Sequence, residues 1–182
     1  MIEQETPDWV DEGDEDVEVG DLSTVPNTDV IDTVRGVVFD IRKANLDTQE
    51  FSLEDGSKCW AKRNLALQLA VGAQGTDGEG KFAGKVFFPR LLLQVNRDDF
   101  PTAFEYDSYE AGKGKKWRPI KQFFAAMGGD VKAINISRAY RDELPGRQVK
   151  ADIIKRTQRR QVDGEWVDGE LENVIENFKS AE

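Results

Sequence analysis

Three short stretches of the chain combine Lys and Arg with a tryptophan. They consist of Trp60, Lys62 and Arg63; of Lys113, Lys115, Lys116, Trp117 and Arg118; and of Arg156, Arg159 and Arg160 with Trp166. Ammonium and guanidinium groups bind phosphates, and an indole face stacks on an unpaired base. The three groups therefore predict a site for single-stranded nucleic acid. The alternatives are solvated loops for the charged residues and core positions for the tryptophans.

Other kinds of chemistry are excluded or poorly supported. The chain has no His, so catalysis by Ser-His-Asp, by Cys-His or by a His base is impossible. Cys59 is the single Cys, which excludes an internal disulfide and a zinc site of ordinary ligands. A magnesium-dependent carboxylate enzyme stays open as a weak alternative, since no acidic cluster has convincing ligand spacing. Residues 111–119 lack the spacing of a phosphate-binding P-loop. We therefore predict neither an enzyme nor a cofactor.

The charge is distributed unevenly along the chain. The formal net charge is −10, yet residues 1–32 hold 12 acidic residues and no Lys or Arg. Residues 163–182 hold seven acidic residues and one Lys, which leaves 24 basic and 16 acidic residues in between. This asymmetry indicates a basic body with acidic ends, and a basic body fits a nucleic-acid partner.

We expect three regions along the chain. Residues 1–28 form an acidic tail without stable structure, residues 29–178 a single domain, and residues 179–182 a short C-terminal tail. Trp9 and Val10 lie within the acidic run. Three roles are open for this tail. It is a motif that recruits a replication or recombination protein, a segment that occupies the basic nucleic-acid groove when nucleic acid is absent, or a segment that keeps the protein soluble. No apolar run reaches the ~20 residues of a membrane span, and no secretory signal is present, so a cytoplasmic location without membrane contact is expected.

Hydrophobic alternation with a period of two predicts mainly strands. We expect strands over residues 30–41 and 49–53, with turns at 45–48 and 54–57. Residues 58–71 alternate like a strand, which we favour; the alternative is a short helix capped by Asn64. Residues 82–95 predict a strand broken at Pro89, because proline has no N–H to donate. Residues 131–136 predict a short strand. Ile120, Phe123, Phe124 and Met127 recur at helical spacing and predict a helix over residues 119–127 that ends at Gly128-Gly129.

The last fifth of the chain predicts a β-hairpin. Val149, Ala151 and Ile153 alternate with polar residues, and Asp163-Gly164 suits a two-residue turn. The basic residues 155–160 lie just before that turn, so we expect a strongly basic tip beside Trp166.

Five or more strands with one or two short helices indicate a mainly β protein. The expected architecture is an OB-fold-like barrel of five strands, which binds oligonucleotides on one face and with two loops. One of those loops joins the last two strands, where the basic segment 155–160 lies.

A family resemblance points the same way. The sequence FFAAMGGD, then ELPGRQVKADIIKR, a DGEW turn and LENVIENF resemble a family of phage-encoded proteins found in replication and recombination gene sets. The resemblance covers residues 118–178, and more loosely 30–95. It implies an OB-fold protein that binds single-stranded DNA in the host cytoplasm, without catalytic residues. The chain differs in ending with NFKSAE, where bacterial-type single-strand binders have an acidic tip with a terminal Phe.

The function expected from the sequence is therefore sequence-tolerant binding of single-stranded DNA in phage replication or recombination. The main alternative is a structural or interaction protein, either a virion accessory protein or an acidic DNA mimic. The oligomeric state, a homo-oligomer included, and the preference between DNA and RNA stay open.

Overall fold

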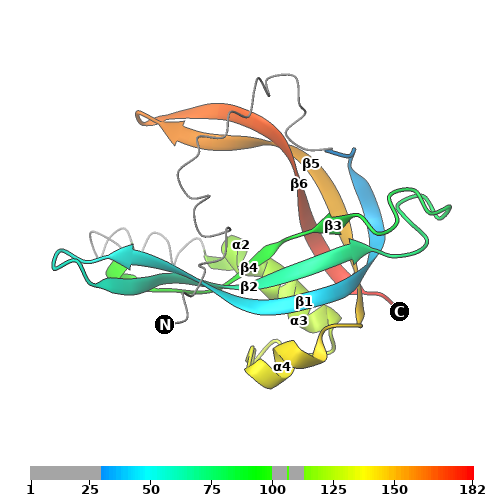
Figure 1. Cartoon of the computed structure of the whole chain (residues 1–182), viewed down its shortest axis with the longest axis horizontal. Helices are drawn as coiled ribbons and strands as arrows, with labels where there is room; N and C mark the ends of the chain where they lie inside the picture. The colour runs from blue at the N-terminus through cyan, green and yellow to red at the C-terminus, as the bar shows by residue number, and fades with distance from the viewer. Residues whose placement is uncertain (1–29, 100–105, 107–112) are drawn as a thin grey trace, which may run out of the picture.

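The computed structural model describes residues 30–99, 106 and 113–182. These residues form one open sheet of six antiparallel strands with three short α-helices and a 3-10 turn (Figure 1). The predicted acidic tail lies outside the described residues. The elements are β1 (Val34–Ser52), β2 (Lys58–Val71), β3 (Val86–Phe87), β4 (Arg90–Val95), η2 (Arg97–Asp99), α2 (Lys113–Lys116), α3 (Arg118–Ala126), α4 (Arg138–Glu143), β5 (Gln148–Val162) and β6 (Glu165–Ser180).

Strand β1 is the centre of the sheet and pairs with different neighbours along its length. Its first part, Val34 to Asp40, pairs with β5, and its later part, Phe39 to Ser52, pairs with β2. A register shift next to Gly36, whose φ is +68°, bends the strand between these two partners. The β1–β2 and β5–β6 hairpins consequently project toward the same side of the molecule, at the left of Figure 1.

The predicted turn at residues 45–48 is wrong, because β1 continues through it. Asn45 pairs with Ala66 and Thr48 with Arg63, so β2 supplies a complete antiparallel partner for this segment. Turn-forming residues are tolerated in a strand whose neighbour satisfies their backbone groups. The turn expected at residues 54–57 is confirmed, as Gly56 N–H donates to the Leu53 carbonyl at 2.9 Å.

The break at Pro89 is confirmed. Strands β3 and β4 lie on either side of Phe88-Pro89, and both pair with β2. The short strand expected over residues 131–136 is wrong, since the structure has turns and irregular chain there. Helix α4 was not predicted, although Ser137 provides a helix cap by accepting a hydrogen bond from Tyr140 N–H at 3.1 Å.

The expectation of mainly β structure is confirmed, but the sheet does not close into a five-stranded barrel. The strand order is β3-β2-β1-β5-β6, with β4 also on β2, so one edge ends at β3 and β4 and the other at β6. Helix α3 contacts both β4 and β6 and so lies across the opening.

The core lies on the inner face of the coiled sheet. Phe39, Leu65 and Ile153 are fully buried there, and α3 adds Phe123, whose ring meets that of Phe178 edge-on at a centroid distance of 5.5 Å. The predicted helix is confirmed with its apolar face inward. Gly128 ends it with φ +85°, a left-handed conformation that glycine adopts without strain.

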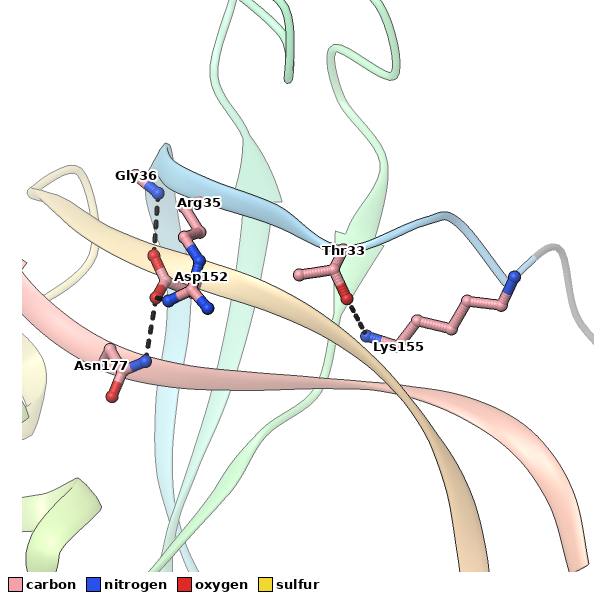
Figure 2. A network of polar contacts seen from close by, with 6 residues as sticks. All are labelled: Thr33, Arg35, Gly36, Asp152, Lys155 and Asn177. Carbon is pink, nitrogen blue, oxygen red and sulfur yellow. Dashed lines mark hydrogen bonds and ion pairs between the residues drawn. The ribbon is translucent and has the colours of Figure 1, made fainter.

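One buried carboxylate connects three strands at their bends. Asp152 on β5 is 6% exposed and accepts hydrogen bonds from Gly36 N–H on β1 at 2.8 Å and from Asn177 Nδ2 on β6 at 2.9 Å (Figure 2). Asn177 has φ +57° and lies at a register shift of β6. Burial alone would raise the pKa of Asp152, but the two hydrogen bonds and the charges of Arg35 and Lys179 lower it below its usual value. The ionised carboxylate therefore holds the two irregular strands in place.

Candidate nucleic-acid interface

The first basic group lies on β2 near the end of the β1–β2 hairpin. The Arg63 guanidinium lies 4.3 Å from the centroid of the Trp60 ring, and its Nη1 donates to Gln94 Oε1 at 3.2 Å. In a regular strand, residues 60 and 63 would face opposite sides. A register shift between Trp60 and Lys62 places an extra residue in β2 and so brings the two side chains to one side.

The second basic group lies beside the first. Helix α2 is a single turn in which Lys115 and Lys116 are exposed, while the side chain of Lys113 lies outside the described part of the chain. The pKa of the Lys116 ammonium is lowered from its usual value, first by partial desolvation and then by the positive charge of Lys62. Two lysines 54 positions apart in sequence are thus held within electrostatic reach of each other. We call Trp60, Lys62, Arg63, Lys115 and Lys116 the β2–α2 cluster.

Trp117 joins this cluster to the core. It is half-buried at the start of α3, packs against core residues, and its Nε1–H donates to the Leu93 carbonyl on β4 at 2.9 Å. Its indole therefore fixes α2 next to β4. Arg118 follows it as the exposed first residue of α3.

The third basic group lies on the part of the β5–β6 hairpin beyond the core, residues 155–171, which we call the arm. Every residue of the arm is exposed, and Trp166 is 64% exposed and is therefore not a core residue. The structure thus places Arg156, Arg159, Arg160 and Trp166 together on one projecting hairpin. The predicted hairpin and its turn at Asp163-Gly164 are confirmed.

The return strand compensates much of the arm's positive charge. Arg156 Nε lies 2.9 Å from Glu172 Oε1, and its Nη1 lies 3.4 Å from Glu176 Oε1. Arg159 Nε lies 3.2 Å from Asp168 Oδ1. The prediction of a strongly basic tip was based on the residues of β5 alone. The antiparallel register brings acidic side chains of β6 opposite the arginines of β5.

Two adjoining hollows follow the arm toward the open side of the sheet. One, of about 710 Å³, is lined by residues 156–160 and by part of β6. The next, of about 500 Å³, lies between residues 87–91 and residues 172–176 of β6, and Arg156 and Glu172 line both. Phe88 is 71% exposed in the second hollow. Phe88 and Arg90 were not predicted as site residues from the sequence. The break at Pro89 was nevertheless a signal that this segment lies at a sheet edge.

The β2–α2 cluster and the arm are separate surfaces. Arg63 and Trp117 line a third hollow, of about 360 Å³, that has no residue in common with the first two hollows. In Figure 1 the two hairpins that carry these surfaces diverge toward their tips. The three basic groups predicted from the sequence therefore form two surfaces. The β2–α2 cluster combines the first group with Lys115 and Lys116 of the second, and the arm carries the third.

The described residues include no group of three or more His, Cys, Asp or Glu side chains that could hold a metal ion. None of the described helices is long and apolar enough to cross a membrane. The class that the fold defines is an open antiparallel β-sheet protein with short helices. No protein-family model matches the chain, and no curated protein matches it in sequence. The resemblance to phage single-strand binders therefore stays a prediction.

Proposed function

We propose that the protein binds single-stranded DNA through the β2–α2 cluster. The observation that carries this proposal is the Arg63 guanidinium held 4.3 Å from the centroid of the Trp60 ring, with two lysines close by. The pKa of Lys116 is lowered first by desolvation and then by the positive charge of Lys62, so these two ammonium groups lie within electrostatic reach of each other. Two ammonium groups near each other repel, and that repulsion raises the free energy of the unliganded protein. A phosphate placed between them would remove the repulsion and release counterions from the nucleic acid.

The neighbouring Trp60 and Arg63 support a partner with exposed bases. A guanidinium held over an indole forms a flat, preorganised surface, and such surfaces stack bases without regard to sequence. In duplex DNA the base faces are covered by their neighbours, so this surface favours single strands. The proposal is therefore sequence-tolerant binding with a preference for unpaired strands.

The strand order supports an OB-like fold in an open form. If β3 and β4 count as one strand interrupted at Pro89, five strands remain in the order β3/β4-β2-β1-β5-β6, with α3 between the third and fourth strands along the chain. OB-folds are partly open five-stranded barrels that bind oligonucleotides. Together with the phage-family resemblance of residues 118–178, this order supports a role in phage DNA replication or recombination in the host cytoplasm. On the same basis we propose that the acidic tail recruits a partner protein.

Fluorescence anisotropy of a labelled oligo-dT tests the proposal at low and at moderate salt. We expect the wild-type protein to bind saturably, with an affinity that falls steeply with salt. Lys62→Glu should weaken binding by about tenfold or more. It replaces one of the two positive charges beside the proposed phosphate site by a negative charge, which repels the phosphate.

Lys81→Glu is the matched control. It makes the same charge change on an exposed residue of the β2–β3 loop, which lies at the right of Figure 1, away from both hairpin tips. We expect it to change the affinity by less than about threefold. Equal effects of the two substitutions, or binding that does not respond to salt, would contradict the proposal.

A further inference from the structure

A small pocket lies next to the β2–α2 cluster and continues the core toward solvent. It has a volume of about 360 Å³, which lies at the lower end of the range for small-molecule sites. Its lining includes the fully buried Ile120 and the half-buried Leu93 and Trp117. The indole N–H of Trp117 is bonded to the Leu93 carbonyl, which fixes the ring in the wall of the pocket. The pocket is therefore fixed in shape by core packing.

The mouth of the pocket exposes two large aliphatic side chains. Leu46 on β1 is 44% exposed and Ile134 is 38% exposed, and both line the pocket. Exposed apolar surface around a preformed hollow favours an occupant that removes it from water.

The same pocket carries planar polar groups from three segments. Arg63 of β2, Gln94 of β4 and Asn135 all line it, and Arg63 Nη1 is held by Gln94 Oε1 at 3.2 Å. Guanidinium and amide groups are each planar and together carry hydrogen-bond donors and acceptors, which suits the hydrogen-bonding edge of a base. An aliphatic side chain in the pocket would use none of these groups.

Two lysines are next to pocket residues in the chain. Lys62 precedes the pocket residue Arg63, and Lys116 precedes the pocket residue Trp117. Desolvation first, and then the charge of Lys62, lower the pKa of Lys116, so the two ammonium groups lie within electrostatic reach of each other. An occupant is thus expected to be a flat group with an anion attached close to it.

We propose that this pocket receives one unstacked nucleobase of the bound strand, with the adjacent phosphate held by Lys62 and Lys116. The proposal rests on the proposed function and adds to it a discrete base-binding subsite. Most of the strand then binds by its phosphates and by stacking, while one nucleotide is turned out of the strand and enclosed.

Ile134→Trp tests the pocket, because a larger side chain at its mouth fills it. Val131→Trp is the matched control, since Val131 lies in the same segment, is 39% exposed, and does not line the pocket. Each variant is compared with the wild-type full chain by anisotropy, on a labelled oligo-dT and on an abasic strand of equal length. Thermal melting of both variants checks that they fold.

We expect Ile134→Trp to weaken oligo-dT binding by about tenfold, the equivalent of losing one stacked base. Val131→Trp should stay within about twofold of the wild type. On the abasic strand, which keeps the phosphates and lacks the bases, Ile134→Trp and wild type should bind alike.

Four results would overturn the proposal. The pocket holds no base if Ile134→Trp binds oligo-dT as Val131→Trp does, or if its loss is equal on the abasic strand. It is a peptide site if a synthetic peptide of residues 1–29 binds the wild type and not Ile134→Trp, while oligo-dT binding is unchanged. A wild-type protein that binds neither strand contradicts the proposed function itself, and the subsite with it.

Discussion

Replacing Asp152 by Ala removes the acceptor that connects β1, β5 and β6. Gly36 N–H and Asn177 Nδ2 then lose their partner inside the structure. A buried donor without an acceptor costs about 1–3 kcal/mol, so two of them cost about 2–6 kcal/mol. Gly36 is exposed and Asn177 is half-buried, so water can reach both donors and the lower end applies. The Arg35 side chain is 76% exposed and adds little. We expect Asp152→Ala to lower the free energy of unfolding by about 2–3 kcal/mol.

Urea unfolding followed by tryptophan fluorescence measures this loss. With a slope of about 2 kcal/mol per M, the midpoint should fall by about 1 M. Asp168→Ala is the control, because it removes the same charge from an ion pair with Arg159 in which both side chains are largely exposed. Its effect should lie within about 1 kcal/mol of zero. If Asp152→Ala costs no more than Asp168→Ala, the network does not hold the bends of the sheet.

The loss of unfolding free energy in Asp152→Ala should depend on pH in one direction. The pKa of Asp152 is lower in the folded protein than its usual value of 3.8, so the folded state favours the ionised carboxylate. This contribution is fully present above the unfolded pKa and is lost as the pH falls through the folded pKa. The difference in stability between wild type and Asp152→Ala should therefore be constant from about pH 5 to 7 and narrow below about pH 4. A difference that grows on acidification would refute the assignment of an ionised Asp152.

Two further outcomes follow from the contacts. Arg159→Glu should change oligo-dT affinity less than Lys62→Glu in the same anisotropy assay, because Arg159 is already paired with an acidic side chain of β6; an equal loss would place the arm in the binding site. Gly129→Ala should destabilise the protein by about 1–3 kcal/mol in urea unfolding, because its Cβ would overlap the buried ring of Phe124, whereas Gly114→Ala has open space around it and should cost nothing measurable.

Local sequence patterns predicted the elements whose partners lie nearby in the chain. The spacing of Ile120, Phe123 and Met127 predicted α3, since a helix contains its own hydrogen bonds and needs only one apolar face. The β5–β6 hairpin was predicted because its turn, Asp163-Gly164, and its alternation lie in one stretch.

The predictions that failed depended on distant pairing. Residues 45–48 have turn chemistry, but β2 extends alongside them and holds them in β1. Residues 131–136 have strand chemistry, but they join no edge of the sheet. In both cases the deciding factor was whether a neighbouring strand was present, and single-sequence patterns do not contain that information.

The sequence predicted which residues form the candidate site, but not how they are arranged in space. Counting back from the hairpin turn would place Asp168 opposite Arg159, so this ion pair was within reach of the sequence. The register shift beyond it, which brings Glu172 opposite Arg156, was not. The proximity of Lys62 and Lys116 depends on Trp117 fixing α2 against β4, a tertiary contact with no local signature.

The arm has a property that matters for engineering the molecule. Its residues touch solvent on both faces, so its length is not fixed by the core. Adding one residue to each strand would exchange the faces of every side chain beyond the insertion, and would turn Trp166 to the other side. Adding two to each strand keeps the faces and extends the arm by roughly 7 Å. The hairpin is thus an adjustable spacer, with steps of two residues per strand, by which the distance from its turn to the sheet can be changed while its surface pattern is kept.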